Sequence, residues 1–171
     1  LLIIGNDRAG LLETTEAAVE AIAKIDDVIT PFPGGIVRSG SKVGTKYKGM
    51  FASTNDAFCP TLRGTVKSEL GPDSIAVLEI VIDGLTSKVV ADAMRAGLKA
   101  ITAVGASKGV TRVSAGNYGG KLGKFHFRLH ELLRAGLGTR DSGLGASSLL
   151  PSSDLGPEPR GGRKPWAAHE P

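Results

Sequence analysis

Two glycine-rich loops carry the side chains best suited to binding an anionic or amide-rich small ligand. In residues 31–44 two prolines fix φ, while four glycines permit positive φ and a close approach of the backbone. Residues 114–124 form a second loop rich in glycine and lysine, and together the two loops indicate a site. Taken alone, the first loop could be an ordinary tight connection. The predicted binding residues in the loops are Gly34, Gly35, Arg38, Ser39, Ser41, Lys42, Asn117, Tyr118 and Lys121.

A polar cluster at residues 53–56 lies in a segment, residues 50–63, that has no clean helical or strand period. Such a cluster is typical of a helix cap or a turn. Its hydroxyl and amide groups could also donate hydrogen bonds to a ligand. Ser53, Thr54 and Asn55 are therefore further candidates for ligand binding.

Glu79 interrupts an otherwise apolar run, residues 75–82. Strand alternation puts its side chain on the same face as Val77 and Val81, so the carboxyl lies either on a solvated sheet face or against apolar groups. Burial favours the protonated form of a carboxyl, which can then donate a hydrogen bond or a proton. Glu79 is thus a candidate acid, with a solvated strand glutamate as the alternative.

The sequence shows no metal-site or nucleotide-binding pattern. His126, His130 and His169 have no second ligand at metal-binding spacing, and Cys59 is the only cysteine. The glycine loops match neither G-x-G-x-x-G after a strand nor G-x-x-x-x-G-K-[ST]. We therefore expect no metal, and a phosphate-binding module is only an alternative.

Composition predicts one globular domain. The chain has 171 residues, 41% of them hydrophobic, which is enough for a core. The net charge of +4 is modest and the basic residues are scattered among acids, so we expect no nucleic-acid binding.

No apolar run approaches the roughly 20 residues of a membrane span, and a lone cysteine suits a reducing compartment, so a cytoplasmic protein is expected. Residues 1–5 resemble the middle of a buried strand, which indicates a fragment of a longer protein.

Hydrophobic periodicity predicts an α+β fold of the ferredoxin-like, split βαβ type. One amphipathic helix is expected after Asp7, ending near Asp26, and a second from Thr86 to Gly105. Runs of strands between two such helices favour an antiparallel or mixed sheet with the helices on one face. The predicted strands are residues 1–4, 36–38, 43–47, 65–69, 74–83, 110–114 and 125–129.

The composition changes from about residue 134. Residues 136–171 include 7 glycines, 5 prolines and 5 serines, and they show no hydrophobic period. Such a segment cannot bury enough apolar surface to offset the entropy lost on ordering. The sequence therefore predicts a folded lobe over residues 1–133 and a disordered tail over residues 134–171.

Four stretches resemble the formylmethanofuran:tetrahydromethanopterin formyltransferases, a family that includes a subunit of the bacterial formyltransferase/hydrolase complex. They are residues 31–48, 52–63, 79–84 and 115–124, and the whole resemblance covers residue 1 to about residue 133. Its most specific parts are Pro-Phe-Pro-Gly-Gly-Ile-Val and Gly-Asn-Tyr-Gly-Gly-Lys-Leu-Gly. The resemblance implies an enzyme of two similar α+β lobes, of which this chain is most of the second, and the tail has no counterpart in the family.

The same resemblance implies transfer of a formyl group between the amine of methanofuran and N5 of tetrahydromethanopterin, without a metal or prosthetic group. It implies that Glu79 is the catalytic acid and that Arg38, Lys42, Lys46 and Lys121 are available to anionic groups of the substrates. It also implies a homo-oligomer, possible association with hydrolase subunits, and little activity in this chain alone. An interface or assembly lobe and a phosphate-binding module are the alternatives.

Overall fold

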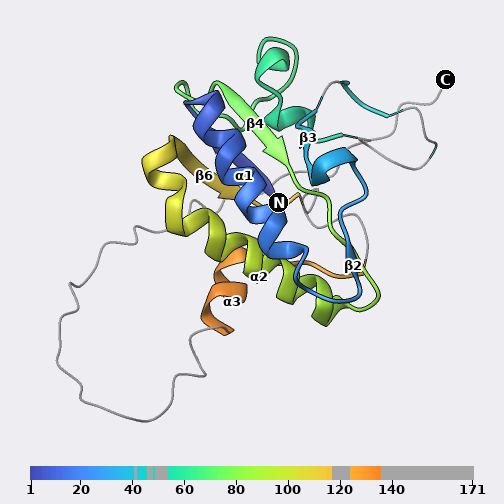
Figure 1. Cartoon of the computed structure of the whole chain (residues 1–171). Coiled ribbons are helices and arrows are strands. Elements are labelled where there is room, and N and C mark those ends of the chain that lie inside the picture. Colours follow the sequence, from blue (N-terminus) through green and yellow to red (C-terminus); the bar gives the residue numbers. More distant parts are fainter. Residues whose placement is uncertain (41, 46–47, 49–53, 117–123, 136–171) are drawn as a thin grey trace, which may run out of the picture. The chain divides into compact units, whose positions relative to one another are not determined.

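A four-stranded antiparallel sheet organises the part of the chain that the structure describes. The computed structural model describes residues 1–40, 42–45, 48, 54–116 and 124–135, all within the unit Leu1–Arg140 (Figure 1). The strands of this sheet, in spatial order, are β3 (Val37–Arg38), β4 (Ala76–Glu79), β1 (Leu2–Gly5) and β6 (Val110–Ser114). A smaller sheet pairs β2 (Val28–Ile29) with β5 (Asp83–Gly84). The predicted α+β class is confirmed.

β1 is buried on both faces because it lies between β4 and β6 and each face of the sheet is covered. Ile3 faces the helices and belongs to a buried cluster with Leu11. Leu2 and Ile4 point to the opposite face, where they cluster with Val77. The unbroken apolar run that predicted this strand therefore reflects two separate cores.

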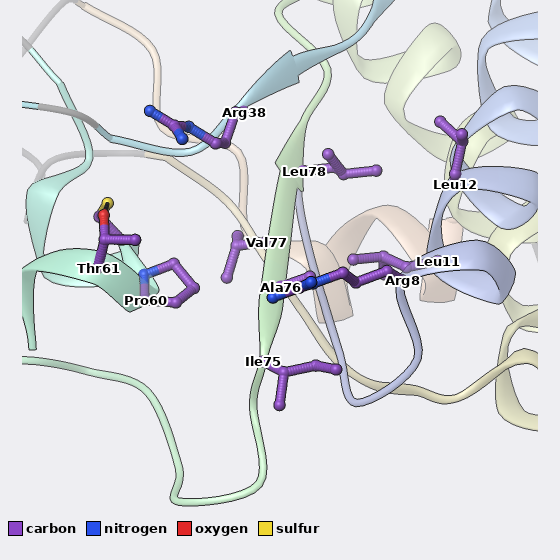
Figure 2. A pocket seen from close by; sticks show the side chains of 11 residues that line it. Arg8, Leu11, Leu12, Arg38, Pro60, Thr61, Ile75, Ala76, Val77 and Leu78 are labelled. Atoms are coloured by element: carbon purple, nitrogen blue, oxygen red, sulfur yellow. Dashed lines mark hydrogen bonds between the residues drawn. The ribbon is translucent and has the colours of Figure 1, made fainter.

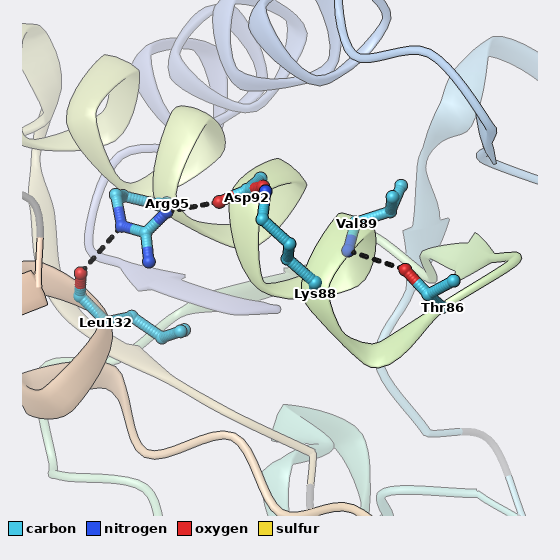
Figure 3. Close-up of polar contacts among 6 residues, drawn as sticks. All are labelled: Thr86, Lys88, Val89, Asp92, Arg95 and Leu132. Atoms are coloured by element: carbon cyan, nitrogen blue, oxygen red, sulfur yellow. Dashed lines mark hydrogen bonds and ion pairs between the residues drawn. The ribbon is translucent and has the colours of Figure 1, made fainter.

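Two helices, α1 (Arg8–Ile22) and α2 (Ser87–Val104), cover one face of the sheet. Asp7 caps α1 by accepting a hydrogen bond from the N–H two residues later, at 3.1 Å. Thr86 caps α2 by accepting from the N–H three residues later, at 3.2 Å (Figure 3). Both helices therefore begin where the sequence predicts. α1 ends at Ile22, however, before the predicted end near Asp26.

The segment 55–70 covers the other face of the sheet. Phe58 and Leu70 pack against the cluster that contains Val77. The segment turns back on itself, so that the backbone N–H of Glu69 donates to a carbonyl within the segment at 2.9 Å. The predicted strand at 65–69 is therefore wrong, because these residues bond within their own segment instead of to a sheet. The segment includes two 3-10 turns, Asp56–Phe58 and Pro60–Leu62.

Three other predicted strands differ from the structure. The strand predicted at 74–83 is shorter, since β4 ends at Glu79 and Asp83 pairs in the smaller sheet. Residues 125–128 form no strand, because Phe127 packs beside α2 and the chain then turns into a helix. Residues 43–45 form no strand, and the rest of that prediction, 46–47, lies outside the described residues.

The helix α3 (Leu129–Ala135) packs on α2. Leu132 is buried against Met94 and Leu98, and its carbonyl accepts a hydrogen bond from Nε of Arg95 at 2.9 Å (Figure 3). The same guanidinium donates to Asp92 at 2.5 Å. Arg95 therefore ties the last described helix to α2. The remainder of the predicted tail, residues 136–171, lies outside the described residues.

We expect Arg95→Ala to lower the free energy of unfolding by about 1–2 kcal/mol, because it removes the hydrogen bond that holds the Leu132 carbonyl. Lys88→Ala is the matched control: Lys88 also pairs with Asp92, at 2.7 Å, but its side chain is 84% exposed. That variant should change the free energy by less than about 0.5 kcal/mol. Urea unfolding measures both values, and equal losses from the two variants would show that α3 does not depend on Arg95.

Candidate functional site

Glu79 ends β4 on the sheet face that lies away from the two helices. It is opposite Leu2 in β1 and opposite Val37 in β3. It shares its face with Val77, as strand alternation predicted. Leu2 and Val77 on this face are both buried and Glu79 itself is half-buried, so its carboxyl lies beside apolar groups. This is the second of the two alternatives that the sequence left open.

The two oxygens of the Glu79 carboxyl have different surroundings. Oε2 accepts a hydrogen bond from Nδ2 of Asn55 at 3.1 Å. Oε1 is buried and has no hydrogen-bond partner among the residues that the structure describes. A buried oxygen of this kind is costly unless a partner arrives, and a substrate is one such partner. The carboxyl is therefore fixed on one side and available on the other.

Glu79 and Asn55 line a cavity of about 290 Å³. Its other walls are largely apolar and come from distant parts of the chain, including Leu2, Met94 and Phe127. An apolar pocket with a few converging polar groups is typical of a small-molecule site.

The first glycine loop mainly holds the backbone around this cavity. Gly35 is buried against α1, where an added Cβ would lie 2.7 Å from Val19. Gly40 has a φ of +46°, and an added Cβ would lie 2.8 Å from the carbonyl oxygen of Asn55. Thr54 donates from its hydroxyl to the carbonyl of Lys42 at 2.8 Å. These contacts bring the loop and Asn55 together beside β4.

The other described candidates of the first loop do not line the Glu79 cavity. Gly34 is exposed with a φ of +66° and nothing within 4 Å of an added Cβ. Ser39 is fully buried; its N–H donates to Val77 at 3.2 Å, and its hydroxyl has no partner among the described residues. Arg38 is exposed on β3 and lines a different pocket. Ser41, Lys46, Ser53, Asn117, Tyr118 and Lys121 lie outside the described residues.

Sequence reasoning missed several cavity residues. Among the described residues of the second loop, Ala115 and Gly116 line the cavity, and neither was selected in advance. An added Cβ at Gly116 would lie 3.3 Å from Nδ2 of Asn55, so glycine lets the loop approach this amide. Gly116 could have been selected from the sequence, because it belongs to the glycine-rich loop. Met94 and Phe127 could not, because the hydrophobic pattern around each of them indicated only a core residue.

An apolar pocket of about 370 Å³ lies beside the edge of β4 and shares no lining residue with the Glu79 cavity (Figure 2). Leu12 and Ile75 contribute apolar surface, and both are more than 40% exposed. Arg8 and Arg38 bring guanidinium groups to its lining. We call this surface the edge pocket. None of the described residues that line it is an acid.

Among the residues that the structure describes, no group of three or more His, Cys, Asp or Glu side chains could hold a metal ion. None of the helices in the described ranges is long and apolar enough to cross a membrane.

The chain resembles known proteins over most of the described part. The family model described as "FTR, proximal lobe" matches residues 1–132. A formylmethanofuran–tetrahydromethanopterin formyltransferase of Methylobacillus flagellatus is 58% identical over 132 residues, which is 77% of this chain and 44% of the relative. A protein of Methylorubrum extorquens, named as one of the subunits of the formyltransferase/hydrolase complex, is 58% identical over 133 residues, 78% of this chain and 43% of the relative.

Solved structures give the same result. The formyltransferase/hydrolase complex of Methylorubrum extorquens, solved with methylofuran, matches with a TM-score of 0.68 and 57% identity, covering 77% of this chain and 43% of that one. The formyltransferase of Methanosarcina barkeri matches with a TM-score of 0.65 and 49% identity, covering 77% and 44%. This chain thus spans less than half the length of the relatives it matches.

Proposed function

The chain belongs to the formylmethanofuran–tetrahydromethanopterin formyltransferase family, whose proximal lobe it matches over residues 1–132, and we propose that it provides this lobe to an enzyme that moves a formyl group between methanofuran and N5 of tetrahydromethanopterin. The observation that carries the proposal is the Glu79 carboxyl, which has one oxygen held by Asn55 and the other buried without a described partner in an apolar cavity. No prosthetic group is needed for this transfer.

The residues account for the proposed chemistry at the reacting atoms. The amine N5 attacks the formyl carbon, the C–N bond to methanofuran breaks, and the leaving amine gains the proton that N5 loses. Attack creates a tetrahedral intermediate with a developing negative charge on oxygen, which a positioned donor stabilises. Protonated Glu79 is the proposed donor. It either donates a hydrogen bond to the developing oxyanion or transfers its proton to it.

The size of the cavity implies that the other half of the enzyme completes the site. About 290 Å³ is at the lower end of small-molecule pockets, so it suits the reacting groups rather than two large substrates. The rest of each substrate must then contact surfaces beyond this lobe. A chimeric protein can restore those surfaces. In it, the part of the Methylobacillus flagellatus relative that precedes the matched region is joined to Leu1, and we refer to this protein as the chimera.

A thermal-shift titration of the chain tests which ligands it binds. We expect tetrahydromethanopterin or methanofuran to raise the melting temperature, since a ligand that binds only the folded state stabilises it. ATP is the control ligand for the phosphate-binding alternative. A shift with ATP alone would support that alternative, and no shift with any of the three would support the assembly function described next.

Assembly is the second candidate function, and the edge pocket favours it. Its apolar surface and the guanidinium groups of Arg8 and Arg38 suit a neighbouring subunit that brings apolar side chains and carboxylates. The Methylorubrum extorquens relative belongs to such a complex. We propose a homo-oligomer that can also join hydrolase subunits, and size-exclusion chromatography with and without those subunits distinguishes the two assemblies.

We place the protein in the cytoplasm, because Cys59 is a buried free thiol.

We propose further that this lobe is a ferredoxin-like, split βαβ unit. α1 connects β1 to β3, and β4 lies between those two strands; α2 connects β4 to β6, and β1 lies between them. Two crossovers that each skip one strand are the defining feature of this arrangement. All pairs in the main sheet are antiparallel, which agrees with it.

The proposed boundary puts the lobe at residues 1–133 and a separate tail at residues 134–171, although α3 continues to Ala135. Deleting residues 136–171 is expected to change the melting temperature by no more than a neutral surface substitution does. Differential scanning calorimetry of the two chains measures this. A loss of several degrees would show that the tail contributes to the stability of the fold.

A further inference from the structure

We propose that Asn55 is a positioning residue that determines which oxygen of Glu79 carries the transferable proton. The inference rests on the proposed role of Glu79 as the acid. Nδ2 of Asn55 donates to Oε2 of Glu79 at 3.1 Å, across 24 positions in the sequence. An amide N–H₂ group can only donate, so Oε2 must present a lone pair to it. When Glu79 is protonated, its proton therefore sits on Oε1.

Oε1 is the oxygen that a substrate can use. It is buried and has no hydrogen-bond partner among the described residues, while Glu79 itself lines the cavity. The opposite orientation of the Asn55 amide would set its carbonyl oxygen against Oε2. That arrangement brings two acceptors together when Glu79 is ionised, and directs the proton toward Asn55 when it is not. Only the donating orientation serves both protonation states during a reaction cycle.

Several segments hold Asn55 beside Glu79. The backbone carbonyl of Asn55 accepts from the N–H of Phe58 at 3.0 Å, and Phe58 packs on the sheet. Gly40 and Gly116 lie close on two other sides, where an added Cβ would come within 2.8 Å of the Asn55 carbonyl oxygen and 3.3 Å of Nδ2, respectively. A residue whose backbone is held on two sides, and whose side-chain amide has a third segment close to it, can orient a neighbouring carboxyl with little further loss of entropy during the reaction. The polar cluster that sequence analysis interpreted as a cap or a ligand donor thus gains a third role.

The expected effect of this role is on turnover and not on affinity. In the chimera, Asn55→Ala lets the carboxyl rotate, and we expect kcat to fall by about 10- to 100-fold while KM changes by less than about threefold. Asn55→Asp keeps the shape of the side chain but removes the donor, and kcat should fall by a similar factor. Ser68→Ala is the control, since Ser68 lies in the same covering segment, bonds only to nearby backbone groups, and lines neither cavity. It should retain kcat within about threefold.

A double-mutant cycle separates positioning from direct substrate contact. If Asn55 acts through Glu79, adding Asn55→Ala to Glu79→Gln should lower kcat by less than about twofold further. A full additional loss in that background would show that Asn55 contacts the substrate, and a wild-type kcat for both single Asn55 variants would also overturn the proposal. If instead Glu79→Gln alone has no effect, the proposed acid fails and the role of Asn55 fails with it, a result distinct from the other two.

Discussion

Purified alone, this chain is expected to transfer formyl groups at least about 10³-fold more slowly than the chimera. Orientation of two reactants is worth several kcal/mol of the barrier, and that gain requires both substrates to be held in place. The cavity at Glu79 has a volume of only about 290 Å³, and the chain spans 44% of the length of the Methylobacillus flagellatus relative. On the proposed function, this lobe carries the acid, and the surfaces that orient the substrates lie largely in the part of the relatives that this chain does not match.

Formyl transfer from formylmethanofuran to tetrahydromethanopterin is measured at matched concentrations of chain and chimera. Thermal unfolding of both proteins is the control, because it shows whether a slow chain is nevertheless folded. A folded chain that reaches a rate within about tenfold of the chimera would mean that this lobe alone is a sufficient enzyme.

Glu79→Gln in the chimera is expected to lower kcat by about 10²- to 10³-fold, the usual loss for a donor to a developing oxyanion. The substitution keeps the shape of the side chain and its contact with Asn55. It replaces the proton that Oε1 is proposed to carry with an amide N–H₂ group, which can donate a hydrogen bond but does not transfer a proton. Because the acid acts mainly in the transition state, KM should remain within about threefold.

Glu16→Gln provides the matched control for this loss. Glu16 is exposed on α1, on the helical side of the sheet, and lines neither cavity. Steady-state kinetics of the two variants should therefore differ by the full effect of Glu79. A kcat for Glu79→Gln within about threefold of the unmodified chimera would remove Glu79 from the mechanism.

Local patterns in the sequence were sufficient for the elements with strong periodicity or a clear cap. Asp7 and Thr86 start the two helices as predicted, and strand alternation gave the correct face for Glu79. These features depend on neighbours a few residues away. Such neighbours are visible in any sequence, which is why the predictions succeeded.

Features that depend on distant contacts could not be predicted in the same way. The segment 65–69 resembles a strand, yet its N–H groups bond within the segment that covers the sheet. Gly35 resembles a ligand-binding glycine, whereas its neighbour is Val19 of α1. Asn55 lies 24 positions from its partner Glu79. In each case the deciding contact comes from the tertiary fold, and no local pattern encodes it.

A crystal structure of the chimera with Glu79→Gln and both substrates bound would test most directly whether the Glu79 cavity is the site of formyl transfer. The slow variant allows formylmethanofuran and tetrahydromethanopterin to be trapped together. We expect the formyl oxygen to lie within about 3 Å of the side-chain amide introduced at position 79, with N5 facing the formyl carbon. A formyl group bound at the edge pocket, or anywhere else outside the Glu79 cavity, would contradict the account.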